Sequence, residues 1–451
     1  MATPQVTTRI LRRLLASGVH MRAERLLARM APADVAVLLP ELASDEIRTV
    51  IELLFRQRRA ARALRELPHE MLPQVFEALA DQRLADVIGR LEIDDLLELV
   101  EWIPEERREL IVSKLPEQRR AELDKAELYP KDSAGRVMTS SFVALDQKMT
   151  AQEAIDSLRS NGDDTEEVLY LYVVDDQRAL TGVVPIRRLV SAPPDRCVAD
   201  MMIPEPVSVS AEDDQEEVAR VVRRFDLLAV PVTDVDGRML GLITVDDVID
   251  VITEEATEDI YHLAGLTEAD RVFVPARESI QNRLPWMLLN LGTAFAAAWV
   301  VGLFERTLEQ VVALAIFMPV VAGMGGNGGT QALTVITRAI ALGEIEFSSG
   351  LRAAMKELSV GLTIGIIVGG VGAGIAYLWQ GNPILGISLF LAMVLTLSVA
   401  GLLGAAVPLG LKALKLDPAL GSGVIVTTFT DAFAFFSFLG IATLLMDRMI
   451  V

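Results

Sequence analysis

Cysteine and histidine are almost absent from this sequence of 451 residues. The single cysteine, Cys197, excludes a disulfide framework and any thiolate metal site within one chain. The three histidines (His20, His69 and His262) do not have the spacing of a zinc hydrolase, and none lies in the apolar C-terminal part. A GxxxxGK phosphate-binding loop and a nucleophile–base pair are also missing. We therefore predict that the protein is not an enzyme.

Positive charge is scarce as well. The chain carries 42 lysines and arginines against 62 aspartates and glutamates, a formal net charge of -20. Residues 284–451 hold only eight of the acids and seven of the bases, so the excess negative charge lies almost entirely in residues 1–283. Such a segment repels nucleic acid and anionic lipid head groups and attracts cations. The first twenty residues show no secretory signal, so we expect a cytoplasmic N-terminus and no nucleic-acid partner.

Long apolar runs dominate the C-terminal part. Five stretches each exceed or approach the 20 or so helical residues that a bilayer requires. They are Leu284–Phe304, Leu308–Ala332, Val360–Trp379, Ile384–Leu409 and Gly423–Met446. The basic residues in the loops after the second and fourth stretches are Arg338, Arg352, Lys356, Lys412 and Lys415, and the opposite side offers Arg306 and Arg448. Because basic loops remain cytoplasmic, the pattern predicts a multi-pass protein of the cell (inner) membrane with its C-terminus outside.

An aspartate, Asp431, lies eight residues into the fifth stretch. A carboxylate at that depth costs roughly 2.5–3.5 kcal/mol on insertion scales and normally faces a polar cavity, a partner or an ion. Every lysine and arginine of this part lies near the end of a stretch, and the hydroxyl of Thr428 is close in sequence. Asp431 is therefore a candidate ligand for a cation in transit. The alternative is a protonated acid that is hydrogen-bonded to a neighbouring helix.

The second stretch contains a glycine-rich segment, residues 322–331, which follows a proline. Its five glycines, among them Gly325 and Gly326, would each weaken a helix by about 1 kcal/mol. We predict an interrupted helix whose freed carbonyls line a water-filled path together with Asn327 and Thr330. The alternative is a small-residue interface that lets helices pack closely.

These candidate ligands are all oxygens. An oxygen-only set suits Mg²⁺ or Ca²⁺ rather than zinc or copper, and Mg²⁺ would remain mostly hydrated because it loses water reluctantly. One carboxylate and one interrupted helix are too few to enclose a pore. A symmetric homodimer, with the second and fifth stretches near its axis, would double the oxygens.

Residues 138–256 contain an internal repeat. Val174–Leu189 recurs as Val232–Val248, with Gly182 and Gly241 at equivalent positions. Each copy follows the order strand, helix, strand, turn, strand, helix, and a unit this small should pack against its copy. The pattern resembles a tandem CBS pair, a regulatory α/β module that often binds adenine nucleotides between its halves.

The last helix of the repeat is dense in acids and leads into the first apolar stretch. Acids at helical spacing are Asp247, Asp250, Glu254 and Glu258 on one face, and Glu255 and Asp259 on another. Like charges at this spacing cost a few tenths of a kcal/mol per pair. Such a run can be a solvated face. Its position favours a sensor instead, because divalent ions would cancel the repulsion and draw neighbouring domains together.

Residues 10–128 have leucines at helical spacing and prolines between the runs, which predicts short paired helices in a superhelix. The predicted fold is a multidomain membrane protein. Its parts are an acidic all-α N-terminal domain (1–130), a tandem CBS pair (131–256, with copies at about 137–198 and 199–256), a connecting helix region (246–282) and a transmembrane domain of five helices (283–451).

This order of parts resembles the MgtE family of magnesium channels over essentially the whole chain. The segments that carry the resemblance are Pro319–Gln331, Thr244–Asp250 with Glu255–Asp259, Asp214–Arg220, and Asp417–Leu420 leading to Asp431. The resemblance implies a homodimeric channel for Mg²⁺ uptake whose central pore binds Mg²⁺ at Asp431. It also implies that intracellular Mg²⁺ closes the gate.

Regulatory Mg²⁺ sites outside the pore are implied in the same way. Their residues would be Asp94 and Glu98 of the helical domain; Asp214, Glu216, Asp226 and the carbonyl of Arg223 in the CBS pair; Asp247, Asp250, Glu255, Glu258 and Asp259 on or near the connecting helix; and Asp417 below the pore. ATP would bind the CBS pair, with Tyr170 stacking on adenine. Thr330 stands where many members have asparagine, so we expect ion discrimination to differ from theirs. An acid that some members carry in the early helices falls near Arg62 in this chain, so we expect one cytoplasmic site to be missing or reshaped.

Two other functions fit the same residues. One is a cation-coupled carrier of divalent metals such as Mg²⁺ and Co²⁺. The other is a membrane-anchored metal or nucleotide sensor that transports nothing, for which Asp431 would be an unnecessary energetic cost. The residues do not decide between Mg²⁺, Co²⁺, Ni²⁺ and Mn²⁺.

Overall fold

The computed structural model describes residues 4–161, 170–266, 270, 274–345 and 349–445. It divides into two compact units, residues 1–252 and 253–451. Parts of four predicted segments lie outside the described residues: 162–169 of the first CBS copy, 267–269 and 271–273 of the connecting region, 346–348 of the membrane domain, and 446–451, which include the predicted end of the fifth stretch and the C-terminus.

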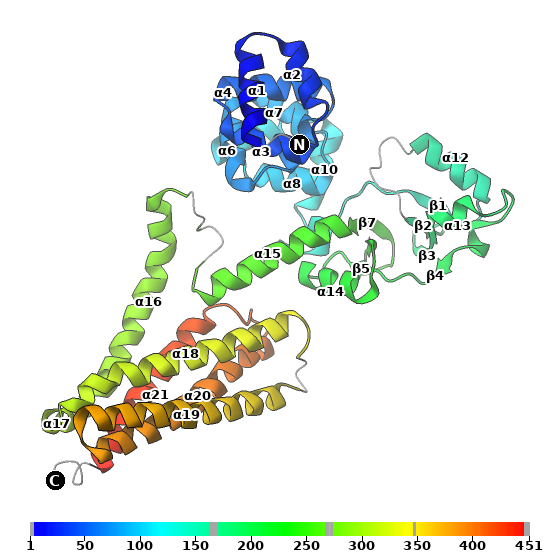
Figure 1. Ribbon diagram of the computed structural model, residues 1–451. Helices are drawn as coiled ribbons and strands as arrows, with labels where there is room; N and C mark the ends of the chain where they lie inside the picture. Colours follow the sequence, from blue (N-terminus) through cyan, green and yellow to red (C-terminus); the bar gives the residue numbers. More distant parts are fainter. Residues whose placement is uncertain (1–3, 162–169, 267–269, 271–273, 346–348, 446–451) are drawn as a thin grey trace. The chain divides into compact units, whose positions relative to one another are not determined.

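The N-terminal part of the first unit is built of short helices in two rows (Figure 1). They are α1 (Pro4–Ala16), α2 (His20–Leu27), α3 (Pro32–Leu38), η1 (Leu39–Glu41), α4 (Ser44–Arg56), α5 (Ala60–Arg65), η2 (His69–Met71), α6 (Leu72–Ala78), α7 (Asp81–Ile88), α8 (Ile93–Glu101), α9 (Glu105–Val112) and α10 (Glu117–Ala126). Helices α3, α5, α7 and α9 contact one another in succession, and so do α2, α4 and α6. Pro32 and Pro73 stand in the first turns of α3 and α6, where the missing N–H has no helical partner to lose. One apolar core lies beneath both rows, which confirms the predicted superhelix.

The remainder of the first unit is a duplicated α/β module. The first copy contains α11 (Ala134–Val137), β1 (Ala144–Asp146), α12 (Ala151–Asn161), β2 (Tyr170–Val174), β3 (Leu180–Pro185), α13 (Ile186–Val190) and η3 (Val198–Asp200). The second contains β4 (Ile203–Pro204), β5 (Val209–Ser210), α14 (Gln215–Phe225), β6 (Ala229–Thr233), β7 (Met239–Thr244) and the start of α15 (Val245–Leu263). In each copy the first strand runs parallel to the second and the third runs antiparallel to it. This identical topology confirms the predicted CBS pair.

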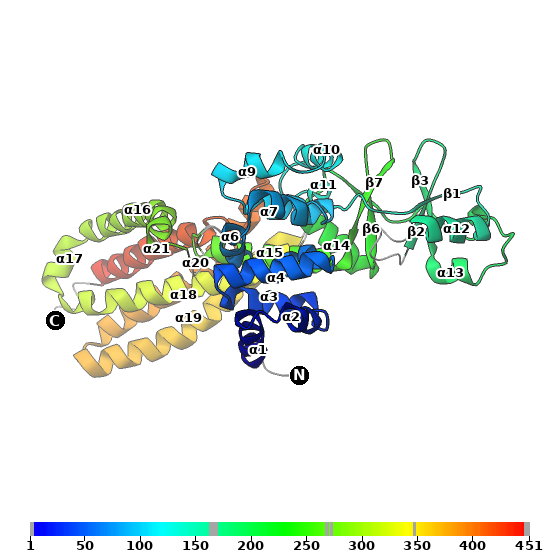
Figure 2. The same cartoon turned by 90° about the horizontal axis from the view of Figure 1, so that it is seen from above.

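The two copies exchange the segments that open them, and their sheets lie next to each other (Figure 2). Strand β4 pairs with β3 of the first copy, and Thr139 pairs with Leu242 on β7 of the second. Glycines make room for both crossings. A Cβ at Gly182 would lie 2.5 Å from the sulfur of Met202, and a Cβ at Gly241 would lie 2.5 Å from the carbonyl oxygen of Thr139. The equivalent glycines of the repeat therefore join the two copies into one body.

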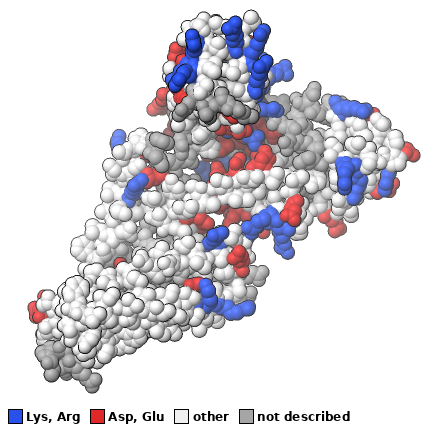
Figure 3. All heavy atoms as spheres, in the orientation of Figure 1, with Lys and Arg blue, Asp and Glu red and all other residues white. Residues whose placement is uncertain are grey.

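The second unit consists of long helices. Those described are the end of α15, then α16 (Ala276–Gly302), α17 (Glu305–Gln310), α18 (Ala313–Ala341), α19 (Gly350–Gln380), α20 (Pro383–Ala413) and α21 (Ser422–Leu444). Four of them, α16, α19, α20 and α21, are long and apolar enough to cross a membrane. Figure 3 shows the face over α18–α20 nearly free of charged side chains along most of its length.

The second predicted stretch, Leu308–Ala332, does not match one helix. Helix α17 ends at Gln310, and α18 begins at Ala313 and continues to Ala341. At 29 residues, α18 is long enough to span a bilayer at about 1.5 Å per residue. Its glycines and polar side chains, such as Asn327 and Gln331, interrupt its apolar sequence.

Helices α19 and α20 pack closely along a row of glycines on α19. A Cβ at Gly361 would lie 2.2 Å from the carbonyl oxygen of Leu397, and a Cβ at Gly365 would lie 2.9 Å from the Cα of Val394. Glycines four residues apart share a helix face, so the two backbones approach each other without side chains between them.

Gly361→Leu is expected to destabilise the second unit by about 3 kcal/mol, because the new side chain would have to displace the backbone of α20. Thermal unfolding of the detergent-purified protein measures this. Gly370→Ala is the matched control, since a Cβ at Gly370 meets nothing within 4 Å. Equal melting temperatures for the Gly361→Leu protein and the control would contradict the packing argument.

Candidate functional site

Asp431 lies within α21, half-buried among the helices of the second unit. In the part of the chain that the structure describes, no basic side chain pairs with its carboxylate and no neighbour donates a hydrogen bond to it. The hydroxyl of Thr428 donates to the carbonyl of Val424 at 2.6 Å, so its proton is already used. Asp431 therefore keeps its acceptor oxygens available to water or to a cation.

The glycine-rich segment does not interrupt its helix, so that prediction is wrong. Helix α18 is continuous through Pro319 and the glycines that follow. Neighbouring helices cover Gly325 and Gly329: a Cβ at Gly325 would lie 2.7 Å from Cγ2 of Thr396, and a Cβ at Gly329 would lie 2.7 Å from Cγ1 of Val426. The observed arrangement is the alternative, a small-residue interface within a helix that has no break at the glycines.

The predicted path residues on α18 lie on two faces. Gly325 is buried, whereas Asn327 and Thr330 are exposed and Gly326 is half-exposed. The Thr330 hydroxyl donates to the Gly326 carbonyl at 2.9 Å, within the helix. The exposed face continues with Gln331. Helix α18 thus presents a polar stripe on the surface of a unit whose other long helices expose apolar side chains.

Helices α18 and α21 cross beside Asp431. A Cβ at Gly325 would lie 3.8 Å from the carbonyl oxygen of Thr430, and a Cβ at Gly329 would lie 3.3 Å from Cγ2 of Thr430. Asp431 is the next residue, so the two candidate segments meet at this crossing.

A second group of acids surrounds Arg65 in the first unit. The guanidinium Nε lies 3.1 Å from Oδ1 of Asp95, on α8. Its Nη2 lies 3.3 Å from Oδ1 of Asp247 and 3.4 Å from Oδ2 of Asp246, both in the first turn of α15. Asp94 adds a buried Oδ1 that has no hydrogen-bond partner among the described residues.

The protonation of this cluster reflects burial and crowding. Burial raises the pKa of Asp95 to about 7, with Arg65 opposing the shift and Asp247 adding to it. Burial also raises the pKa of Asp247 to about 6, despite a hydrogen bond from Thr244 at 2.5 Å. The pKa of Asp94 is raised well above its ordinary value by burial and then by Asp95. Burial and neighbouring acids make the ionised forms of these acids unfavourable, and a bound cation would stabilise those forms.

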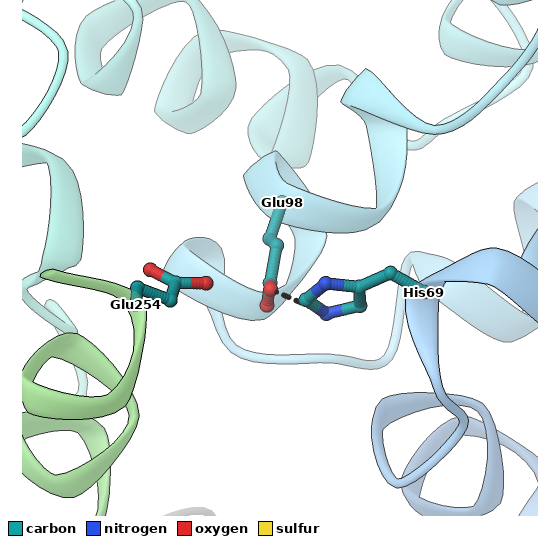
Figure 4. A group of neighbouring side chains, drawn as sticks. All are labelled: His69, Glu98 and Glu254. Atoms are coloured by element: carbon teal, nitrogen blue, oxygen red, sulfur yellow. Dashed lines mark ion pairs between the residues drawn. The ribbon is translucent and has the colours of Figure 1, made fainter. Parts of the chain in front are cut away.

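Glu98, also on α8, pairs with a histidine (Figure 4). Its Oε1 lies 2.8 Å from Nε2 of His69, and the His69 ring packs against Trp102 with 5.4 Å between ring centroids. Burial and then Glu98 raise the pKa of Asp250, which follows Asp247 by one helical turn. The structure therefore brings Asp94, Glu98, Asp247 and Asp250 to one region of the first unit.

Three kinds of family profile match the chain. A profile described as "Divalent cation transporter" matches residues 318–441, one described as "MgtE intracellular N domain" matches 30–132, and the CBS domain matches 134–195 and 198–254. The magnesium transporter MgtE of Thermus thermophilus is 34% identical over 442 residues, covering 97% of this chain and 98% of the relative. That of Bacillus subtilis is 34% identical over 378 residues, covering 84% of each. The chain belongs to the MgtE family.

Two solved structures of magnesium-transport proteins resemble the first unit of this chain. The soluble part of a magnesium transporter matches with a TM-score of 0.53 and 27% identity, covering 56% of this chain and 99% of the other. The cytosolic domain of the Mg²⁺ channel MgtE in complex with ATP matches with a TM-score of 0.51 and 34% identity, covering 54% and 99%. Both agree with the helical domain and CBS pair described above.

Glu258 and Asp417, two of the Mg²⁺ ligands that the family resemblance implies, both contact His262 in the second unit. Nδ1 of His262 lies 2.7 Å from Oδ2 of Asp417, and its Nε2 lies 3.6 Å from Oε1 of Glu258. Asp417 Oδ1 also accepts a hydrogen bond from the Ala419 N–H at 2.8 Å, which holds the loop before α21. The end of α15 is thereby attached to the loop that leads to Asp431.

The acids predicted as ligands on the second CBS copy lie at the two ends of α14. Asp214 caps the N-terminus of α14 by accepting the Glu216 N–H at 2.8 Å, whereas Asp226 is its C-cap. The 11 residues between them place these two acids about 18 Å apart. Glu216 is half-buried and pairs with Arg220 at 3.3 Å. Arg223 is exposed on the last turn, near Asp226.

The remaining predicted site residues lie on a strand and on a helix. Tyr170 begins β2, where it pairs with Pro185, and is half-buried. Glu255 and Asp259 lie on α15 in the second unit, with partly buried side chains.

Sequence reasoning missed Arg65 and His262. The i, i+4 spacing of Glu258 and His262 was a local signal for one contact of the histidine. Nothing in the sequence links Arg65 to Asp95 or Asp247, because their proximity depends on how the helices pack.

Proposed function

We propose that this MgtE family member is a Mg²⁺-selective, homodimeric channel for magnesium uptake that intracellular Mg²⁺ closes. The observation that carries the proposal is Asp431, a half-buried carboxylate on a membrane helix that has no basic partner among the described residues. An ionised carboxylate is retained at such a position when it serves an ion path. Relatives carry the name magnesium transporter, and one solved relative is called a Mg²⁺ channel.

The polar stripe of α18 supports the homodimer. Asn327, Thr330 and Gln331 are exposed on one chain, and facing lipid would leave their polar groups without partners. A second copy with α18 near a shared two-fold axis would cover the stripe and bring two Asp431 carboxylates to one path. Two carboxylates with amide and hydroxyl oxygens suit a hydrated Mg²⁺.

The acidic cluster of the first unit supports control by Mg²⁺. Asp94, Asp247 and Asp250 have raised pKa values because they are buried near other acids, so divalent ions would stabilise the arrangement in which they lie together. Helix α15 begins at this cluster, and its His262 contacts Asp417 in the loop before α21. Ion binding at one end of the helix would therefore bias the loop at the other. ATP bound at the CBS pair, with Tyr170 stacked on adenine, would make this control by Mg²⁺ depend on the nucleotide as well.

Flux through the purified protein in proteoliposomes tests the function. With an imposed membrane potential, we expect Mg²⁺ entry that needs no coupled counter-ion and rises without saturation over millimolar concentrations. Entry that saturates and depends on a second ion gradient would favour the carrier. Absence of flux from a correctly folded protein would favour the membrane-anchored sensor. Repeating the measurement with Co²⁺, Ni²⁺ and Mn²⁺ defines selectivity.

A further inference from the structure

Arg65 is a positive charge held between two acidic segments of the first unit. It ends α5, and 29% of its side chain is exposed. It contacts Asp95 at the start of α8 and both Asp246 and Asp247 at the start of α15. A single guanidinium therefore connects two helices that are distant in the sequence, and it does so from a third helix.

The acids at the start of α15 are not needed to form the CBS fold. In the first copy of the repeat, the residues equivalent to Asp246 and Asp247 are Arg187 and Arg188, at the start of α13. Both copies nevertheless form the same strand order, followed directly by a helix. An acid near a helix N-terminus contributes only about 0.3–1 kcal/mol. The acidic pair accepts hydrogen bonds from Thr244 next to it, and its contact beyond its own segment is Arg65.

The cluster retains more negative than positive charge. Asp94, Asp95, Asp246 and Asp247 are all close enough to shift the pKa of Arg65, and together they raise it although burial alone would lower it. Asp94 keeps a buried oxygen with no hydrogen-bond partner among the described residues. A divalent cation and a guanidinium are both drawn to these carboxylates, and because the two positive charges repel each other, binding of one weakens binding of the other.

We propose that Arg65 is a tethered cation, which holds the start of α15 against α8 when no divalent ion is bound and competes with that ion when it arrives. The second half of this inference rests on the proposed control by Mg²⁺. Arg65 would then set how much Mg²⁺ the cytosolic part needs before it responds. Because the guanidinium is covalently attached, it is present at a constant local concentration, whereas Mg²⁺ varies.

Removing the positive charge of Arg65 should weaken the contact between α8 and α15 without metal, but should make that contact respond to less Mg²⁺. Without metal, Arg65→Gln should loosen the contact, because Asp95 and Asp247 would then repel each other. With Mg²⁺, the same change should lower the ion concentration that restores the contact by about tenfold, or about 1.4 kcal/mol, because the competitor is gone. A variant that merely damaged the fold would loosen the contact without improving its response to Mg²⁺.

Hydrogen exchange of the full-length protein in detergent measures both effects. Peptides covering the first turns of α8 and α15 are followed in EDTA and across a Mg²⁺ titration. We expect Arg65→Gln to exchange several-fold faster than the parent protein in EDTA. Arg65→Lys keeps the charge but not the forked geometry, so it should loosen the contact in EDTA without the lower Mg²⁺ midpoint. Arg56→Gln is the matched control: Arg56 is an exposed arginine at the end of α4.

The possible results separate the two ideas. Unchanged exchange in EDTA overturns the bridging role of Arg65. A Mg²⁺ midpoint equal to that of the Arg56→Gln control overturns the competition. If the parent protein itself gains no protection from Mg²⁺, the proposed cytosolic sensing fails and the competition fails with it. The exchange in EDTA still decides whether Arg65 bridges the two helices.

Discussion

Asp431→Ala is expected to lower Mg²⁺ uptake in proteoliposomes by at least a hundredfold while the protein stays folded and the proposed dimer stays assembled. The charge that would meet the ion is removed, and no other acid lies in α18 or α21. Stability should not fall, because a carboxylate in a membrane helix costs roughly 2.5–3.5 kcal/mol on insertion scales and alanine does not. Loss of uptake would then report on ion binding rather than on folding.

Two further variants sharpen this result. Asp431→Asn keeps the volume and one carbonyl oxygen but removes the charge, and we expect it to be nearly as inactive as the alanine variant. Glu309→Ala is the matched control, because Glu309 is an exposed acid at the end of the short helix α17. Its uptake should stay within about twofold of the parent protein. Light scattering in detergent checks the dimer. Full uptake by Asp431→Ala would remove the basis for the pore assignment.

Neutralising Asp247, Asp250 and Glu258 together, as Asn, Asn and Gln, is expected to leave the proposed channel open at millimolar Mg²⁺. The first two belong to the acidic cluster, where burial raises their pKa values, and the third contacts His262 near the end of α15. Without these carboxylates, Mg²⁺ has less charge to neutralise and so less effect on the helix. The Mg²⁺ concentration that halves the flux should rise at least tenfold.

The matched control for this triple variant removes three acids elsewhere in the first unit. Glu117, Asp124 and Glu127 are exposed residues of α10 or its C-cap, and their neutralisation changes the net charge by the same amount. Inhibition by Mg²⁺ should be unchanged in the control. Current or uptake recorded against cytosolic Mg²⁺ measures both proteins. Equal inhibition of the triple variant and the parent would show that these acids do not sense the ion.

Much of the fold follows from local patterns. Neighbouring residues in the sequence predicted the short, proline-separated N-terminal helices and the duplicated strand order around Gly182 and Gly241. They also predicted four of the apolar helices. Each of these features depends on periodicity or on the conformational limits of one residue type, which act over a few positions. The exchange of opening segments between the CBS copies was not predicted, because it depends on which surface each segment meets.

The glycine-rich segment shows where local reasoning ends. Five glycines in seven residues weaken an isolated helix, and the prediction of an interruption followed from that. In α18 the same glycines allow close contact, at Gly325 with Thr396 and at Gly329 with Val426. Whether glycine breaks a helix or packs it depends on what covers it.

The sequence alone therefore determined that this protein has an acidic N-terminal part of helices and CBS repeats, followed by an apolar C-terminal part. It also determined that one carboxylate of the apolar part, Asp431, is far in sequence from any lysine or arginine. Hydropathy, repeats and charge are properties of neighbouring residues, so they can be read without coordinates. The tertiary structure alone decided that α18 stays continuous, that Arg65 lies among Asp95 and Asp247, and that His262 reaches Asp417. Those outcomes depend on distances between segments far apart in the chain, which only packing sets.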